Sequence, residues 1–375
     1  MPSKYSTKIK SNSFTEVIPF YKYQRRDGGW RDGMVTGNGH IGVVCSGSPY
    51  SETLIYQDVY FIMPTPDPRV IPPEVTNELH EARQAVINFD DSWNVHDRKR
   101  TFLYRFHPGP QIRLNIPKQE ILDYVRQTDY EKAEVSVKYT DQNGTWMRRT
   151  FSSREDDVTI TEITKSDTGS KINVVISIDD VSSMAGFGKG PEKEMQYKKI
   201  VDEDCSHISM IAHYPAYAGS ELIEGGYAAV SRIITVGGEK KKVLLSGNTN
   251  EKINVGAEKN PAVSIAGADA VYIITKTSRT HHLGKLDEFA ATQKHDILVE
   301  LLSNIKEVVE KYKDEMGNFS YDLALAPHVK KQSELFNAVR FSLGSDADKN
   351  CFNEELLNRQ KQSRDLLDAM VERAY

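Results

Sequence analysis

The sequence is poor in cysteine, and this argues against two kinds of stabilising site. Only three cysteines occur among 375 residues, Cys45, Cys205 and Cys351, far apart and with no CxxC pair. A disulfide framework needs an even number of cysteines and a zinc site needs clustered ligands. Neither is expected, and no metal site is assigned. A reducing compartment is the simplest expectation.

The sequence also lacks a basic surplus and any long apolar run. Lys and Arg total 48 against 53 Asp and Glu, a formal net charge of −5, whereas nucleic-acid-binding proteins usually carry a basic face. No run reaches the roughly 20 apolar residues that span a membrane. The first ten residues lack the apolar core of a secretory signal. The sequence as it stands therefore predicts a soluble, cytoplasmic protein with no nucleic-acid or membrane partner.

Up to about residue 285 the sequence has the pattern of β-strands. Short apolar or alternating runs are bounded by Gly, Pro and Asn, at 41–45, 134–139, 158–163, 172–178, 231–236, 242–245 and 270–275. Residues 141–144 predict a hairpin with Asn-Gly at its tip, and 237–240 predict a second turn. One helical insert is expected at 74–86. Many short strands separated by turns are typical of a β-sandwich or barrel, so a mainly β fold is expected.

After residue 290 the apolar spacing becomes helical. Between 294 and 313 apolar residues recur every three or four positions, which predicts an amphipathic helix that Gly317 ends. A second helix is expected from Pro327 to Gly344, because proline suits a first turn and glycine a stop. This helix would bury Leu335, Phe336, Val339 and Leu343. A third is expected at 353–371. Because no end signal precedes Tyr375, the chain is interpreted as part of a larger protein.

Candidate chemistry is concentrated in the glycine-rich segment 37–42 (GNGHIG), which Trp30 precedes. Its outline resembles a phosphate-binding loop, but such a loop opens a helix, and here a strand follows. Two interpretations stay open. The glycines allow a tight turn into the strand, or the loop presents Asn38 and His40 to a ligand or a neighbouring domain. The acidic run 202–204 is expected to be a solvated turn, and the histidine pair 281–282 a solvated loop.

Motifs of the common hydrolases are missing. The sequence has no Ser-His-Asp order, no HExxH motif and no nucleophile elbow. No catalytic residue is therefore assigned from a motif, and no cofactor is expected.

Several segments, however, match one enzyme family in their order. They are Trp30 with 36–44, 52–58, 104–114, 123–153 and 323–343, of which 123–153 is the most specific. Together they resemble glycoside hydrolase family 95, the α-L-fucosidase and α-L-galactosidase family, which is related to the maltose-phosphorylase-like family 65. Gln57 and Asp58 stand where family 95 has Asn-Glu, which indicates a divergent branch.

The resemblance implies an architecture. Residues 1–285 would form a large antiparallel β-super-sandwich, 286–320 an α-helical linker, and 321–375 the first helices of an incomplete (α/α)6 barrel. In such enzymes the catalytic acid and an NLQG segment lie in the barrel. This chain has no NLQG, so the resemblance carries over no catalytic residue. It implies a barrel-facing loop near the substrate, formed by Trp30, Asn38, His40, Gln57 and Asp58.

Three functions are open at this point. The first is the N-terminal part of an inverting α-L-fucosidase-like or α-L-galactosidase-like hydrolase. It would act on an oligosaccharide or glycan once joined to its missing C-terminal barrel and would be inactive alone. The second is a non-catalytic carbohydrate-binding or assembly module, which predicts an exposed aromatic platform. The third is the N-terminal domain of a family-65-like glycoside phosphorylase, which predicts a full-length enzyme that depends on phosphate.

Overall fold

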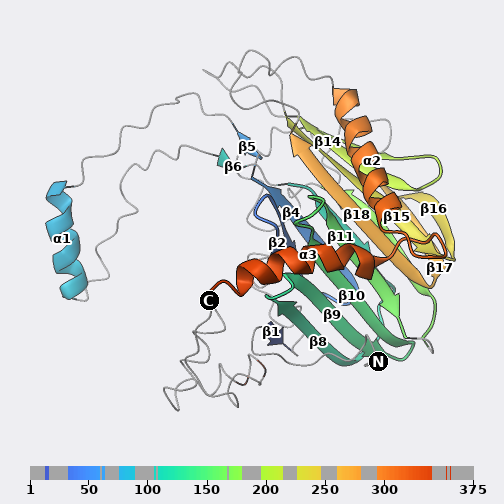
Figure 1. Cartoon of the computed structure of the whole chain (residues 1–375), viewed down its shortest axis with the longest axis horizontal. Coiled ribbons are helices and arrows are strands. Elements are labelled where there is room, and N and C mark those ends of the chain that lie inside the picture. Colours follow the sequence, from blue (N-terminus) through green and yellow to red (C-terminus); the bar gives the residue numbers. More distant parts are fainter. Residues whose placement is uncertain are drawn as a thin grey trace.

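Two large antiparallel sheets dominate the protein, which confirms the expected β-sandwich (Figure 1). The computed structural model describes residues 13–16, 33–59, 61–63, 76–88, 105–106, 109–166, 169–179, 196–213, 226–245, 260–279, 294–339, 352 and 355. Throughout this part the strands pair antiparallel. No helix in it is long and apolar enough to cross a membrane.

The larger sheet has nine strands in the order β1-β8-β9-β10-β11-β18-β15-β14-β13. Its strands are β1 (Ser13–Glu16), β8 (Ile121–Asp129), β9 (Glu134–Asp141), β10 (Gly144–Ser152), β11 (Thr159–Lys165), β18 (Ala270–Arg279), β15 (Gly226–Val236), β14 (His207–His213) and β13 (Gln196–Val201). The predicted hairpin joins β9 to β10. Gln142 and Asn143 form its tip, one residue earlier than expected, because Gly144 already pairs with Asp141.

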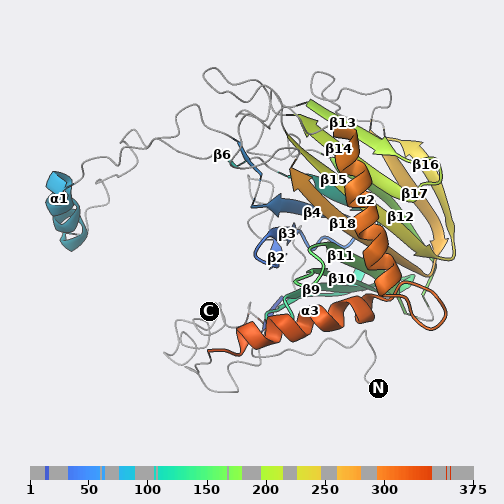
Figure 2. The ribbon, with the colours of Figure 1, turned by 45° about the horizontal axis from the view of Figure 1, so that its top comes forward.

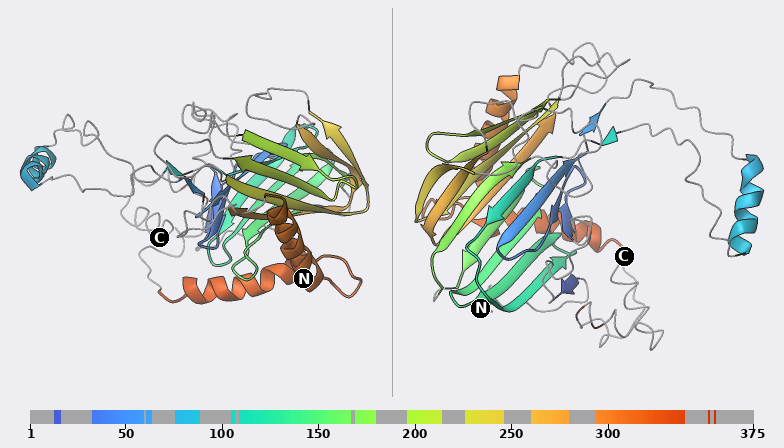
Figure 3. Two further views of the ribbon diagram at one scale, coloured as in Figure 1. Left: turned by 90° about the horizontal axis from the view of Figure 1, so that it is seen from above. Right: turned by 180° about the vertical axis from the view of Figure 1, so that it is seen from behind.

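The second sheet has seven strands in the order β16-β17-β12-β7-β4-β3-β2. Its strands are β16 (Glu239–Leu244), β17 (Pro261–Ala268), β12 (Ile172–Asp179), β7 (Gln111–Asn115), β4 (Ser51–Asp58), β3 (Ile41–Cys45) and β2 (Met34–Gly37). A short ribbon pairs β5 (Ile62–Met63) with β6 (Arg105–Phe106). Figure 3 shows the two sheets as adjoining layers.

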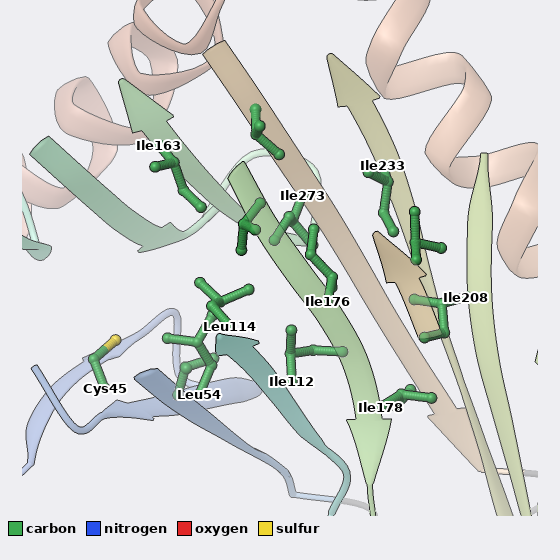
Figure 4. Packing of buried hydrophobic residues seen from close by; sticks show 14 of the residues in the cluster. Cys45, Leu54, Ile112, Leu114, Ile163, Ile176, Ile178, Ile208, Ile233 and Ile273 are labelled. Atoms are coloured by element: carbon green, nitrogen blue, oxygen red, sulfur yellow. The ribbon is translucent and has the colours of Figure 1, made fainter. Parts of the chain in front are cut away.

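The main hydrophobic core lies between these sheets. Along β4 buried and less buried residues alternate strictly, because successive side chains of a strand point to opposite faces. Leu54 and Ile112 from the smaller sheet face Ile233 and Ile273 from the larger one, and all four are at most 1% exposed (Figure 4). Each such side chain contributes about 1.5–3 kcal/mol through burial.

The predicted turn at 237–240 carries the chain from one sheet to the other. β15 ends at Val236 in the larger sheet, and β16 begins at Glu239 in the smaller. Gly237 and Gly238 have φ of +65° and +74°, which favour glycine. At Gly238 a Cβ would also come within 2.7 Å of the Ala266 carbonyl oxygen. The sequence indicates the turn, but the change of sheet appears only in the structure.

Three helices are described. The insert α1 (Thr76–Ile87) lies at its expected position. The helix α2 (Lys294–Lys311) crosses the outer face of the nine-stranded sheet over β15 and β18 (Figure 2). Its inward residues are those of the predicted stripe, namely Ile297, Leu301, Ile305 and Val308, followed by Tyr312. With the outer face of the sheet they form a second hydrophobic core.

The next helix, α3 (Tyr321–Phe336), differs from its prediction. It begins at Tyr321 rather than Pro327, because the Ser320 hydroxyl accepts the Leu323 N–H and caps the helix. Pro327 lies inside the helix. Leu335 and Val339 are 62% and 80% exposed, so the prediction that they are buried is wrong. The buried residues of α3 are Tyr321, Ala324, Leu325 and His328. Leu343, Gly344 and almost all of the expected helix at 353–371 lie outside the described residues.

Candidate functional site

The glycine-rich segment forms a tight turn between β2 and β3. Gly37 pairs with Gly42, and the Asn38 N–H donates to the Ile41 carbonyl over 3.1 Å. The Asn38 Oδ1 accepts the N–H groups of His40 and Ile41 over 2.8 and 2.7 Å. Gly39 has a φ of +94°, and a Cβ added there would meet no atom within 4 Å. Glycine is therefore favoured at this position by the backbone conformation and not by a lack of space. A turn into a strand was one of the two open interpretations.

The amide of Asn38 is fully engaged within the chain. Besides its two acceptor bonds, its Nδ2 donates over 2.9 Å to the Ser153 carbonyl and over 2.9 Å to Asp157 Oδ1. An amide side chain has two N–H donors and an oxygen that accepts two bonds. Because all four are used, Asn38 holds the loop in place, and a ligand would have to displace one of these bonds.

His40 lies between two carboxylates. Its Nδ1 is 2.9 Å from both oxygens of Asp157, and its Nε2 is 3.4 Å from Asp58 Oδ1. Asp58 is 1% exposed and accepts the Thr277 hydroxyl over 3.0 Å. The neighbouring Gln57 amide donates to the Asp58 carbonyl over 3.4 Å. His40 and Asp157 are 33% and 38% exposed, so these two groups, and not Asp58, can meet a molecule from outside.

Asp157 is a stabilised anion. Burial alone would raise its pKa, but hydrogen bonds from Asn38 and His40 and the charge of Lys276 outweigh burial and hold the pKa below its usual value. The Lys276 ammonium lies 3.6 Å from Asp157 Oδ2. Asp157 also has a φ of +54°, which is uncommon for a residue with a side chain. These partners therefore stabilise both its charge and its backbone conformation.

Asp157 ends a five-residue turn, Ser153–Asp157, that joins β10 to β11; we call it the junction turn. Arg154 in this turn bridges two elements. Its guanidinium donates to the Asn38 carbonyl over 3.0 Å and to Gln332 Oε1 on α3 over 2.6 Å. Its backbone N–H donates to His328 Nδ1 over 3.2 Å. The loop that carries His40 and the helix α3 are thus connected through one side chain.

The two acidic residues between them bind the helices. The Lys311 ammonium at the end of α2 is 2.7 Å from Asp156 Oδ1, and the Tyr312 hydroxyl donates to Asp156 over 2.7 Å. Lys331 on α3 is 2.6 Å from Glu155. The Lys331–Glu155 pair lies at the surface, where an ion pair contributes little to stability. Lys311 also lies 3.4 Å from Glu155, so the two acidic residues together connect the turn to the end of α2 and to α3.

His328 is a buried residue that the sequence analysis did not identify as functional. It is 0% exposed, and its Nε2 donates to the Lys132 carbonyl over 2.7 Å. Burial lowers its pKa to about 4, so the neutral ring accepts the Arg154 N–H at Nδ1 and donates from Nε2. Its ring centroid lies 4.9 Å from that of Phe151. His328 therefore joins α3 to the sheet through one polar bond on each side of the ring.

The structure brings together most of the predicted site residues. Asn38, His40 and Asp58 lie in one cluster with Gln57 beside it, while Trp30 lies outside the described residues. The partners that complete the cluster were missed, namely Arg154, Asp157 and Lys276. The signal available for them was the charged run 154–157 (REDD) at the end of a strand. No reacting pair of catalytic groups is apparent among the described residues, because the carboxylates of the cluster are engaged by His40.

A possible metal-binding group lies in the β13–β14 turn. Ligand atoms of Asp202, Asp204 and His207 lie within 4.8 Å of one another. However, Arg232 lies 2.9 Å from His207 Nε2, and His207 Nδ1 is 2.8 Å from Asp202. Both ring nitrogens are thus engaged, and a guanidinium charge adjoins the group, which disfavours a cation. The expected turn at 202–204 is confirmed.

The described surface offers no aromatic platform. Its strongly exposed large apolar side chains are all aliphatic, and they include Val35, Leu122, Val299, Met316 and Leu335. Sugar-binding modules commonly stack rings of their ligand on exposed aromatic side chains. In the described part of the chain this prediction of the binding-module alternative is not fulfilled.

Comparisons with known proteins point to carbohydrate enzymes. The model of the family "Glycosyl hydrolase family 65, N-terminal domain" matches residues 22–279. A solved structure from the human microbiome, described as a kojibiose phosphorylase, is 10% identical with a TM-score of 0.48, over 93% of this chain and 41% of that one. A family 92 α-mannosidase of Bacteroides thetaiotaomicron is 10% identical with a TM-score of 0.19, over 54% of this chain and 26% of that one. No curated protein matches the chain.

Proposed function

Since the chain belongs to the family of glycosyl hydrolase family 65 N-terminal domains, we propose that it is the non-catalytic N-terminal part of a glycoside phosphorylase. The observation that carries this proposal is the family match, which includes the His40 cluster and both sheets apart from β1. The sequence resemblance favoured family 95 and kept family 65 as an alternative. The match supports the family-65 alternative better, and fucose specificity has no support.

The geometry agrees with a scaffold role. The most accessible polar groups of the cluster, His40 and Asp157, are bonded to each other, and Asp58 is buried. Glycoside cleavage requires an acid and a second group placed on opposite sides of a bound sugar. We propose that these catalytic groups lie in a further part of the protein. The chain spans about two fifths of the length of the kojibiose phosphorylase structure that it resembles.

We also propose the division into domains. Residues 1–285 would form the sandwich, 286–320 a helical linker, and 321–375 the start of a helical catalytic domain. The exposed Leu335 in the last turn of α3 and Val339 just beyond the helix agree with this division, because the described residues of the sandwich leave both apolar side chains uncovered. The β2–β3 loop with Asn38 and His40, and the end of β4 with Gln57 and Asp58, would then face the catalytic domain near its glycan substrate.

The test compares two proteins, the 375-residue chain and a version extended by the downstream reading frame. Each is incubated with α-linked glucose disaccharides, with and without inorganic phosphate, and sugar 1-phosphate is measured. The extended protein is expected to release it only with phosphate, and the chain alone to release none. Turnover by the chain alone would contradict the scaffold role. Hydrolysis of an α-L-fucoside or α-L-galactoside without phosphate would instead favour family 95.

A further inference from the structure

The junction turn contacts more elements than any chain reversal needs. Its five residues bind the β2–β3 loop, the end of α2, helix α3 and strand β18. A turn that only reverses the chain, such as 142–143, needs no such partners. Asp157 holds His40, whereas Arg154 contacts both the β2–β3 loop and α3.

We propose that Arg154 is a positioning residue that couples the orientation of His40 to the position of α3. The path has two steps. On one side Arg154 donates to Gln332, and on the other it donates to the Asn38 carbonyl. The Asn38 side chain then fixes the His40 and Ile41 N–H groups. Because the guanidinium group of Arg154 is planar and rigid, a displacement of α3 is transmitted through it to the backbone of the β2–β3 loop.

Helix α3 is stiff enough to act in this way because its first turn is fixed to the sheet. The Tyr321 ring meets Phe151 edge to face at 5.2 Å, and the Arg149 guanidinium lies 4.1 Å above it. The Tyr321 hydroxyl donates to the buried Glu134 over 3.1 Å. The far half of α3 is attached through His328, through the Lys331–Glu155 pair, and through Gln332, which bonds to both Arg154 and the Tyr130 carbonyl. The Gln332–Arg154 bond continues to the Asn38 carbonyl and so links α3 to the loop.

The consequence for catalysis rests on the proposed function. In a larger enzyme, a catalytic domain that follows α3 would set the angle of that helix, and the junction turn would convey this angle to the loop beside the substrate. The coupling itself needs no carbohydrate. It can therefore be tested, and can fail, independently of the proposed activity.

The test uses amide hydrogen exchange of the full chain at His40 and Ile41. Gln332→Ala removes the α3 end of the bridge. It is expected to speed exchange at both amides by about tenfold, which corresponds to about 1.4 kcal/mol. Ser333→Ala is the matched control, because within the described part of the chain the Ser333 hydroxyl bonds to the Lys330 carbonyl of its own helix. This control should leave both amides unchanged.

Two further measurements separate coupling from general loosening. Gln332→Ala also removes the bond from Gln332 Nε2 to the Tyr130 carbonyl, whereas Arg154→Lys leaves this bond and the His328 bond to Lys132 in place. One ammonium cannot span both partners of Arg154, so Arg154→Lys should also speed exchange at His40 and Ile41. The ring nitrogen NMR signals of His40 should shift in both variants, while those of His207, a distant reference, should not. If His40 and Ile41 exchange as in the native chain in either variant, with the His40 ring signals unshifted, the coupling is refuted.

Discussion

At the scale of the residue, two glycines with positive φ have different surroundings. A Cβ added at Gly238 (φ +74°) would lie within 2.9 Å of backbone atoms of Ala266 and Ala268, whereas one added at Gly39 (φ +94°) would meet open space. Gly39→Ala is expected to cost only the conformational penalty of about 1–2 kcal/mol. Gly238→Ala should cost clearly more, because the backbone at the sheet change must also shift. Urea unfolding of both variants measures this, and equal losses would contradict the packing argument.

His328 gives a pH dependence whose sign follows from its environment. Its pKa is lowered from 6.5 to about 4 in the folded chain, so the unfolded chain takes up the proton first. Its contribution is complete above about pH 6.5 and is lost as the pH falls towards 4, at up to about 1.4 kcal/mol per unit. The difference in unfolding free energy between the native chain and His328→Gln should shrink over this range. A difference that stays constant with pH would contradict a buried neutral histidine.

At the scale of the element, α2 contributes through one face. Ile305 is 0% exposed against the sheet, whereas Val299 is 55% exposed. Ile305→Ala is expected to lower the free energy of unfolding by about 2–5 kcal/mol through lost burial and a cavity. Val299→Ala on the outer face should change it by less than about 0.5 kcal/mol. Denaturant titration compares the two, and similar values would mean that α2 is not anchored on the sheet as described.

The helices also show which features of the structure can be predicted from the sequence. The helix α2 and its buried face follow from the apolar residues that recur every three or four positions between 294 and 313. For α3 the proline at 327 is a misleading start signal, since the Ser320 cap and the Tyr321 contacts with the sheet determine where the helix begins. The candidate site, too, depends on contacts between residues that are far apart in the sequence. The loop at 37–42 stands out in the sequence, but Asp157 lies 117 residues from His40, and no local pattern connects them.

At the scale of the whole molecule, the described residues form two hydrophobic cores. One consists of residues from the two sheets, whereas the other also includes residues of α2 and α3. The core between the sheets lies within the segment matched by the family model. The second covers the outer face of the larger sheet and needs α2 and α3, which follow residue 279. Among its sheet residues Ala228, Val230 and Ile274 are 0% exposed, and they share this cluster with the inward side chains of α2. The second core thus contains residues from both sides of the proposed boundary at 285, so we expect the sandwich and the helices that follow it to fold together.

This gives a prediction about shortened chains. A version ending at residue 285 loses the five buried side chains of Ile297, Leu301, Ile305, Val308 and Tyr312, each contributing about 1.5–3 kcal/mol. That loss is comparable with the whole stability of a typical domain, about 5–15 kcal/mol. The shortened chain should bind a hydrophobic dye and self-associate in gel filtration.

A version ending at residue 339 is the control, because it keeps α2 and α3 and should remain monomeric with little dye binding. If the version ending at 285 were equally monomeric and unfolded at the same denaturant concentration, 285 would be a true folding boundary and the helices a separate unit. We expect the opposite, because Ala228, Val230 and Ile274 on the outer face of β15 and β18 are buried in one cluster with the inward side chains of α2. The linker helices therefore belong to the folding unit of the sandwich, and this attachment lets α3 act on the His40 loop.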